Sequence, residues 1–332
     1  MAKKMTCQIC HQPMRLNQSR LFDDRYGAPG LHDIYRCIAC GFGKTAPGLT
    51  RAKIGQFYTD HYPLSVVDAK TLKSQIRLIS PWRAWFEGVD NTTHWQTRKG
   101  QKVLDIGSAS GVSLLEIKAL GGIAYGVEPD PHGARVARQL KLNVHQGFIT
   151  DLPFQNIQFD LITGSQVLEH EPDPKKFLRS AGKKLVASGQ LVLSLPNYDA
   201  LYRHIFRRRW IHWHIPYHLN FFTRKSLSLL ADQAGLEVVT CRTITPNLWT
   251  IMQLRALFTP IQEGRQNPIW TQAVSTGDKA KKNLPTATSL LHRVIVAAVR
   301  FSVWIVMPIN RLVDALGMGE SYLIILQKKT TK

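Results

Sequence analysis

Four of the five cysteines form two identical pairs whose spacing is typical of metal ligands. Cys7 and Cys10 flank two residues near the N-terminus, and Cys37 and Cys40 repeat this arrangement after 26 intervening residues. Two such turns can hold one zinc ion tetrahedrally, with each sulfur about 2.3 Å from the metal. Because four thiolates leave no position for water, we expect a structural site. Unrelated free thiols and redox chemistry are the alternatives, and the duplicated spacing favours zinc over both.

A second pattern suited to ligand binding is the segment VLDIGSASG at residues 103–111, which predicts a strand, a tight turn and the start of a helix. Gly107 and Gly111 allow the backbone to approach a ligand, and the helix N-terminus offers unpaired N–H groups. Glu128 follows Gly107 by 21 residues, at the end of the next predicted strand. A carboxylate there can accept hydrogen bonds from both hydroxyls of a ribose. The glycine spacing is not GxGxxG, which argues against a dinucleotide.

These residues resemble the first motif of the class I S-adenosylmethionine-dependent methyltransferases. The motif is an acidic residue, a glycine, three small residues and a second glycine, and the match is Asp105, Gly107, Ser108, Ala109, Ser110 and Gly111. Glu128, in YGVEPD, matches the ribose-binding acid of the family. The resemblance extends over residues 101–244. It implies S-adenosylmethionine as the cofactor, bound by Asp105, Gly107, Ser108, Ala109, Gly111 and Glu128, with Ser165 and Gln166 lining the donor pocket.

Two histidines are candidates for accepting a proton from the methyl acceptor, because the pKa of imidazole lies near neutrality. His170 directly follows a predicted strand, so we expect it in the ligand crevice at the carboxyl edge of the sheet. Residues 210–223, WIHWHIPYHLNFFT, resemble a segment of ubiquinone-biosynthesis-type O-methyltransferases and of zinc-ribbon methyltransferases that act on sugars. That resemblance implies His218 as the general base. A structural role is the alternative for both histidines, and His212 and His214 have no motif support.

Two further groups are candidates for the acceptor site. Tyr58 and Tyr62 match a YxxxY-like pattern that, in zinc-ribbon methyltransferases, belongs to the region covering the acceptor pocket. Packing in the core is the alternative for these rings. Arg203 and the run 207–209 lie in a loop that we expect beside the acceptor. They could bind an anionic acceptor through bidentate hydrogen bonds, or form a solvated positive surface.

After residue 100, short β-branched runs alternate with helical segments. This alternation predicts a parallel sheet, whose strands and helices must position the residues described above. We expect strands at 102–107, 122–128, 159–164, 190–196, 237–244 and 321–327, and helices at 111–120, 131–141, 174–186 and 223–234. Together with the family resemblance, this implies an α/β fold. Its Rossmann-like methyltransferase sheet is mostly parallel with an antiparallel last strand, joined by a small N-terminal zinc ribbon and a helical C-terminal insert.

We divide the chain into four expected units. They are a zinc ribbon at 1–44, a helical linker covering the acceptor site at 45–100, the cofactor-binding domain at 101–245 plus 319–332, and a basic apolar helical insert at 246–318. A polar, mobile loop is expected at 260–288. Within the insert, Arg293, Arg300 and Arg311 share one helical face, with apolar residues mostly elsewhere. This pattern is typical of a helix lying on an anionic membrane, and packing on the sheet domain is the alternative.

The charge balance points to anionic partners. The 332 residues include 43 Lys and Arg but 23 Asp and Glu, giving a net charge of +20. Such a surplus favours RNA, phosphorylated or nucleotide-linked substrates, or an acidic membrane surface. The longest charge-free apolar stretch in the insert, 301–310, is shorter than the roughly 18 residues that cross a bilayer. The N-terminal residues lack a signal sequence, so we expect a cytoplasmic protein, or one at the inner face of the membrane.

The sequence therefore predicts an S-adenosylmethionine-dependent methyltransferase with a structural zinc ribbon. The expected acceptor is a hydroxyl, or a carbon, of a glycan, a lipid-linked compound or another small anionic molecule. An RNA methyltransferase that holds RNA with its ribbon and basic surface is the alternative, although base-modifying motifs such as NPPY are absent. A non-catalytic scaffold is a third hypothesis, and the intact glycine loop argues against it.

Overall fold

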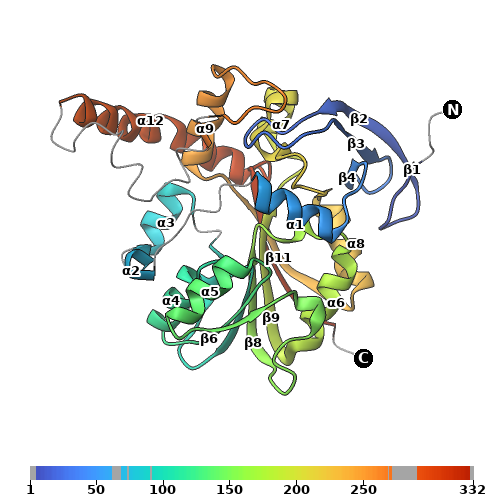
Figure 1. Cartoon of the computed structure of the whole chain (residues 1–332), viewed down its shortest axis with the longest axis vertical. Coiled ribbons are helices and arrows are strands. Elements are labelled where there is room, and N and C mark those ends of the chain that lie inside the picture. The colour runs from blue at the N-terminus through green and yellow to red at the C-terminus, as the bar shows by residue number, and fades with distance from the viewer. Residues whose placement is uncertain are drawn as a thin grey trace.

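A seven-stranded sheet lies at the centre of the chain, in the strand order β11-β12-β9-β8-β5-β6-β7 (Figure 1). The computed structural model describes residues 5–61, 69–72, 75–89, 92–267, 269–270 and 290–329. The strands are β5 (Lys102–Ile106), β6 (Ile123–Glu128), β7 (Asn143–Gln146), β8 (Phe159–Ser165), β9 (Leu185–Pro196), β11 (Leu236–Ile244) and β12 (Ser321–Lys328). Neighbouring strands are parallel except where β12 pairs antiparallel with β9 and β11. The predicted α/β fold with an antiparallel last strand is confirmed.

Helices cover both faces of this sheet, with α4 and α5 on one side and α6 and α8 on the other (Figure 1). Their bounds are Val112–Ala119 for α4, Pro131–Gln139 for α5, Pro174–Lys184 for α6 and Arg224–Gln233 for α8. Three begin at a side chain that accepts a backbone N–H of the first turn, namely Asp130, Asp173 and Thr223. The loops that follow β5, β6 and β8 therefore meet at the carboxyl edge of the sheet, where the expected ligand residues lie.

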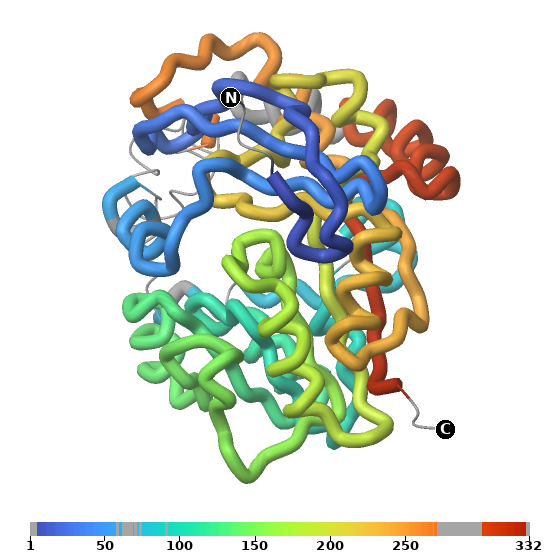
Figure 2. The backbone as a smooth tube through the Cα atoms, turned by 90° about the vertical axis from the view of Figure 1, so that its right-hand side faces the viewer, coloured from blue at the N-terminus to red at the C-terminus, as the bar shows by residue number. Residues whose placement is uncertain are grey.

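The N-terminal residues form a second, five-stranded sheet in the order β1-β2-β3-β4-β10. Its strands are β1 (Met5–Thr6), β2 (Pro13–Leu21), β3 (His32–Cys37), β4 (Gly43–Ala46) and β10 (Asn220–Phe221). This sheet lies across one end of the molecule, beyond the carboxyl edge of the larger sheet (Figure 2). It extends past residue 44, and its last strand comes from a distant part of the chain, with Asn220 opposite Lys44 and Phe221 opposite Gly43.

The remaining helices lie around the carboxyl edge of the larger sheet. They are α1 (Arg51–Asp60), α2 (Ala69–Leu72), α3 (Pro81–Glu87), α7 (Leu201–Phe206), α9 (Asn247–Leu257) and α12 (Leu290–Ala315). The insert between β11 and β12 contains α9 and α12, as the expected helical insert requires. Among the described residues, no helix is both long and apolar enough to span a membrane.

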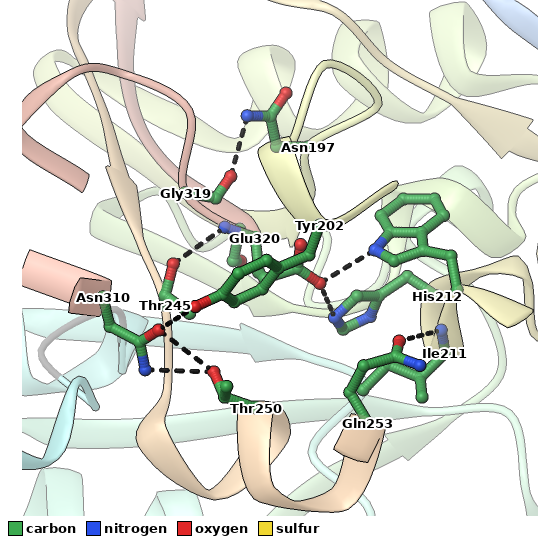
Figure 3. A network of polar contacts seen from close by, with 12 residues as sticks. Asn197, Tyr202, Ile211, His212, Thr245, Thr250, Gln253, Asn310, Gly319 and Glu320 are labelled. Carbon is green, nitrogen blue, oxygen red and sulfur yellow. Dashed lines mark hydrogen bonds and ion pairs between the residues drawn. The ribbon is translucent and has the colours of Figure 1, made fainter. Parts of the chain in front are cut away.

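A buried polar network ties the insert to the sheet domain (Figure 3). The Asn310 side chain accepts a hydrogen bond from Tyr202 Oη at 2.7 Å and from Thr250 Oγ1 at 3.2 Å, and it donates to Asn247 Oδ1 at 2.9 Å. Because Asn310 is wholly buried, these bonds fix the inner face of α12. Tyr62, most of the loop expected at 260–288, and the side chains of Tyr58, Arg293 and Arg300 lie outside the described residues.

Candidate active site

Two adjoining cavities meet at the loop between β5 and α4. The larger has a volume of about 780 Å³ and the smaller about 230 Å³. Both are lined by Gly107, Ala109 and Ser165, so the loop and the end of β8 stand between them. Hydroxyl groups dominate the smaller cavity, whose lining includes Asp105, Ser108, Ser110, Ser113 and Ser165. A donor set of this kind suits the polar end of an amino-acid-like ligand.

The glycines of this loop are required by close packing within the protein. Gly107 and Gly111 have φ angles of +76° and +96°, which side-chain-bearing residues rarely adopt. A Cβ atom on Gly107 would lie 2.6 Å from Val167 Cγ1, and one on Gly111 would lie 2.6 Å from Leu142 Cδ1. The Val167 side chain therefore occupies the space beside the Gly107 Cα, while the Gly107 backbone lines both cavities and Gly111 lines neither.

Glu128 lies at the end of β6 with both carboxylate oxygens held by the backbone. Oε2 accepts the Ala109 N–H and Oε1 accepts the Asp130 N–H, each at 2.7 Å. The side chain is buried but lines the larger cavity, and burial raises the pKa of Glu128 to about 7. Each oxygen keeps a second lone pair, so the carboxylate can also accept hydrogen bonds from two neighbouring hydroxyls. This arrangement fits a ribose.

Two other predicted cofactor residues line the smaller cavity in different ways. Asp105 accepts hydrogen bonds from Ser113 Oγ at 2.5 Å and Thr163 Oγ1 at 2.6 Å, so it connects β5 to α4 and β8. Burial raises the pKa of the Asp105 carboxyl. The Ser108 hydroxyl is buried and has no hydrogen-bond partner in the described part of the chain. An unsatisfied buried hydroxyl at a cavity wall fits a polar ligand group.

Four histidines line the other end of the larger cavity, namely His170, His212, His214 and His218. His170 Nδ1 donates to the Tyr217 carbonyl at 3.0 Å, and His218 Nδ1 donates to the His212 carbonyl at 2.8 Å. Since a carbonyl can only accept, Nδ1 carries the hydrogen in both rings and Nε2 holds the lone pair. His212 differs, because its Nε2 lies 3.1 Å from Glu320 Oε2 (Figure 3). The rings of His170 and His218 therefore present Nε2 as the acceptor nitrogen. His218 Nε2 also lies 3.3 Å from His214 Nδ1, within hydrogen-bond distance of a second imidazole.

Burial sets the protonation of this group. It lowers the pKa of His170 to about 4 and the pKa of His218 well below 6.5, to which the neighbouring His170 contributes. Burial also raises the pKa of Glu169 to about 8. Glu169 Oε1 lies 4.0 Å from His218 Nε2, and neither carboxyl oxygen has a hydrogen-bond partner in the described part of the chain. At neutral pH the Glu169 carboxyl is therefore protonated and the His218 imidazole is unprotonated, so both groups are neutral.

Metal-binding geometry occurs at the four predicted cysteines. Cys7 Sγ lies 3.6 Å from Cys40 Sγ, and Cys10 Sγ lies 3.3 Å from Cys37 Sγ. All four sulfurs lie within 4.8 Å of one another, and thiolates at about 2.3 Å from one zinc ion would be roughly 3.8 Å apart. Gly41 follows with a φ of +75°, as a knuckle turn requires. Glu169, His170 and His218 also bring their donor atoms within 4.8 Å, which is close enough for a cation.

The ribbon sheet holds the backbone of the His218 segment. Thr45 Oγ1 donates to the His218 carbonyl at 2.7 Å, and the Thr45 N–H donates to the Leu219 carbonyl at 3.0 Å. Lys44 Nζ donates to Asn220 Oδ1 at 3.0 Å. Sequence reasoning missed this link, because β4 and β10 are short and more than 170 residues apart.

The structure brings most of the predicted site residues to one cavity. Gly107, Ala109, Glu128, Ser165, Gln166, His170 and His218 line the larger cavity, and α1 adds Arg51, Ile54 and Gly55. Sequence reasoning missed several lining residues, namely Arg25, Tyr26, His214, Trp249, Met252 and Trp270. Only His214 carried a signal, through its four-residue spacing from His218. Arg25 comes from the loop between β2 and β3, and only the tertiary fold brings it here.

The arginine run does not reach the acceptor cavity. Arg203 and Arg207–Arg209 are absent from the lining of both cavities. Arg208 donates to the carbonyls of Ser19 and Arg20, and Arg209 donates to carbonyls in residues 256–259. Of the two interpretations of this run, binding of the acceptor finds no support, because Arg208 binds carbonyls of β2 and Arg209 binds carbonyls at the end of α9 and just after it.

Comparison with known proteins agrees with this geometry. A family model described as a methyltransferase domain matches residues 77–241. Residues 77–241 are therefore similar to a methyltransferase domain. The ubiquinone biosynthesis O-methyltransferases of Azorhizobium caulinodans and Glaesserella parasuis are 30% and 33% identical over 105 and 112 residues. Each match covers 30% of this chain and 42% or 48% of the relative, so the chain spans less than half the length of these curated relatives.

A solved structure, the [4+2]-cyclase SpnF, matches 86% of this chain and 99% of its own, with a TM-score of 0.50 and 15% sequence identity. At this identity the likeness concerns the fold alone. The family match confirms the resemblance to S-adenosylmethionine-dependent methyltransferases, and the methyltransferase domain includes the glycine loop, Glu128 and His170.

Proposed function

We propose that this chain is an S-adenosylmethionine-dependent methyltransferase that methylates a hydroxyl, or a carbon, of a small anionic acceptor. The observation that carries the proposal is the larger cavity. Glu128, Gly107 and Ala109 line this cavity, and His170 and His218 line it too. A donor and an acceptor bound there would be held close together, which is the main requirement for a displacement reaction.

The methyltransferase domain offers separate partners for the parts of the cofactor. Glu128 would hold the ribose hydroxyls, and Ser108, Ser110 and Ser113 would surround the methionine end. Phe148 and Ile149 line the larger cavity on the side of Glu128 and offer apolar surface for the adenine. When bound, S-adenosylmethionine supplies an electrophilic methyl group on a positively charged sulfur.

The histidines would remove the proton that a hydroxyl acceptor loses. His218 Nε2 is the first candidate, because its ring is fixed by the bond from Nδ1 to the His212 carbonyl and its lowered pKa keeps it unprotonated. His170 has the same arrangement through the Tyr217 carbonyl. The ribbon sheet supports this geometry through the bond from Thr45 to the His218 carbonyl.

The acceptor class is inferred from the cavity wall. Tyr26, Trp249, Met252 and Trp270 give it an apolar and largely aromatic lining. The Arg25 guanidinium lies 3.9 Å from the centre of the Trp270 ring and also lines the cavity. It pairs with Asp24 at 3.9 Å and donates from Nη2 to the Ile211 carbonyl, and its remaining N–H groups support an acceptor with a negative group. The O-methyltransferase relatives support an oxygen acceptor. A largely apolar cavity of about 780 Å³ favours a small molecule over RNA, which needs an extended basic groove.

Donor binding tests the proposal directly. Isothermal titration of the full chain with S-adenosylmethionine should show binding, and Glu128→Ala should weaken it at least tenfold, since two hydrogen bonds to an ionisable group are lost. Glu237→Ala is the matched control, because Glu237 is an exposed carboxylate on β11. Binding of NAD in place of S-adenosylmethionine would contradict the proposal, as would equal affinities of the two variants.

A further inference from the structure

Helix α12 exposes apolar side chains on the face opposite its packed side. Phe301, Trp304, Ile305, Ile309, Leu312 and Leu316 are between 52% and 68% exposed. Successive members lie one, three or four residues apart, so they form one stripe along the helix. Val306, Asn310 and Val313 lie on the other side and are buried. The helix is therefore apolar on both faces, and only one of them is covered by the described residues.

Helix α3 continues this stripe. Trp82 and Trp85 are 66% and 47% exposed. Trp82 stacks on Phe86 at a centroid distance of 5.5 Å, and Phe86 meets Trp304 of α12 edge to face at 4.8 Å. The two helices lie side by side on one flank of the molecule (Figure 1). We call the two α3 tryptophans, the five α12 residues and Leu316, which follows α12, the apolar surface. Monomeric soluble proteins rarely expose so many neighbouring apolar side chains.

The composition of the apolar surface fits a lipid bilayer better than other occupants. Tryptophan is enriched where proteins meet the headgroup region, and three tryptophans here accompany long aliphatic side chains. Charge is also complementary, because the chain carries +20 and anionic lipids attract basic proteins. Beside Trp82 and Trp85, Arg77 and Arg83 share a single acidic partner, Glu87, which leaves a positive charge at this edge.

Arg311 has a different role from the one the sequence suggested. It donates to the carbonyls of Trp85 and Thr245 and pairs with Asp314 at 3.0 Å. It therefore ties α12 to α3 and to the end of β11, and does not form a free basic face. The sequence predicts an interface helix with basic and apolar residues interleaved, and the described part of α12 exposes its apolar side chains.

We propose that α3 and α12 dock this chain on the surface of an anionic lipid bilayer through the apolar surface. Helix α9 packs against α12 and connects this surface to the cavity, since Trp249 and Met252 line the cavity while Leu248 and Leu254 of the same helix are exposed. Docking does not depend on the proposed methyl transfer, because no residue of the apolar surface lines either cavity.

Vesicle sedimentation of the full chain tests this proposal. Vesicles of equal parts phosphatidylglycerol and phosphatidylcholine should carry the wild type down, and vesicles of phosphatidylcholine alone should carry less. The double variant Phe301→Ser with Trp304→Ser should bind at least tenfold more weakly, because two large apolar side chains are removed. Leu312→Ser with Leu316→Ser should have a similar effect without touching the contact between Phe86 and Trp304. Leu16→Ser is the matched control, since Leu16 is 54% exposed on β2, away from this surface.

Titration with S-adenosylmethionine shows whether each variant keeps its fold, and it also separates a failure of docking from a failure of the proposed function. The proposal is wrong if the wild type ignores both kinds of vesicle, or if both double variants sediment like the wild type. Sedimentation velocity without lipid tests the alternative that a second copy of the chain binds the apolar surface. A dimer that the double variants convert to a monomer, with no vesicle binding, would assign the apolar surface to a second copy of the chain.

Discussion

Replacing Glu169 with glutamine should change how the stability of the protein depends on pH. Glu169 is wholly buried, and its carboxyl has no hydrogen-bond partner in the described part of the chain. Burial raises its pKa to about 8, compared with 4.5 for an ordinary glutamate. The folded protein therefore keeps a proton that the unfolded chain releases. The stability that this proton contributes is fully present below pH 4.5 and is lost as the pH rises through about 8.

The size of the effect follows from the same two values. At pH 7 the unfolded chain gains roughly 3 kcal/mol by ionising Glu169, while the folded chain gains almost nothing. Glutamine has a similar shape and no such proton, so Glu169→Gln removes this pH dependence. The free energy of unfolding of the variant, relative to the wild type, should therefore rise by roughly 3 kcal/mol between pH 5 and pH 8.

Urea denaturation at several pH values measures this difference, with Glu237→Gln as the exposed control. If the free energy of unfolding of the wild type and of Glu169→Gln changes with pH in the same way, the raised pKa of Glu169 is refuted. A variant that becomes relatively less stable as the pH rises would show that Glu169 is ionised and paired with His218. In that case the imidazole would already carry a proton and could not serve as the proposed base.

Further predictions concern the base and the metal. His218→Ala should lower kcat by about 10²-fold to 10⁴-fold with little change in donor affinity, because it removes a proton acceptor and leaves Glu128 in place. Steady-state kinetics measure kcat, and titration with S-adenosylmethionine measures donor affinity. An unchanged kcat would indicate that His170 is the base instead. Because the pKa of His218 is lowered, kcat of the wild type at saturating donor should persist below pH 6.5 and decline only in more acidic solution, which a profile of kcat against pH would show. Metal analysis should find one zinc ion per chain and Cys37→Ser should lose it; a second equivalent that survives in Cys37→Ser would belong to Glu169, His170 and His218.

Local patterns in the sequence were sufficient for most of the larger sheet. The runs at 102–107 and 159–164 are apolar and bounded by turns, and the structure has β5 and β8 there. The strand β7 was missed because its four residues contain one buried apolar side chain, Val144. A segment so short carries almost no periodic signal, and its pairing with β6 places it at the edge of the sheet.

Site residues could be predicted from the sequence where they directly follow a predicted strand. Glu128 and His170 follow predicted strands directly, so their position at the carboxyl edge of the sheet could be derived. The roles of Arg208 and Arg209 could not, because a cluster of charges does not reveal which carbonyls will accept its hydrogen bonds. The same limit applies to Arg25, which enters the cavity from the loop between β2 and β3. Such contacts depend on how two sheets pack, and one sequence does not encode that packing in any short pattern.

The pairing of β4 with β10 has a consequence for the order of events during synthesis. All four cysteines and β4 leave the ribosome before β10 does, so zinc can bind before the sheet is complete. The last strand of the same sheet follows about 170 residues later. At 5–20 residues per second, the open edge of β4 would wait on the order of ten seconds or more for its partner. A nascent chain would thus hold its metal well before His218 reaches its final position, and the unpaired edge offers a site for chaperone contact or mispairing during that interval.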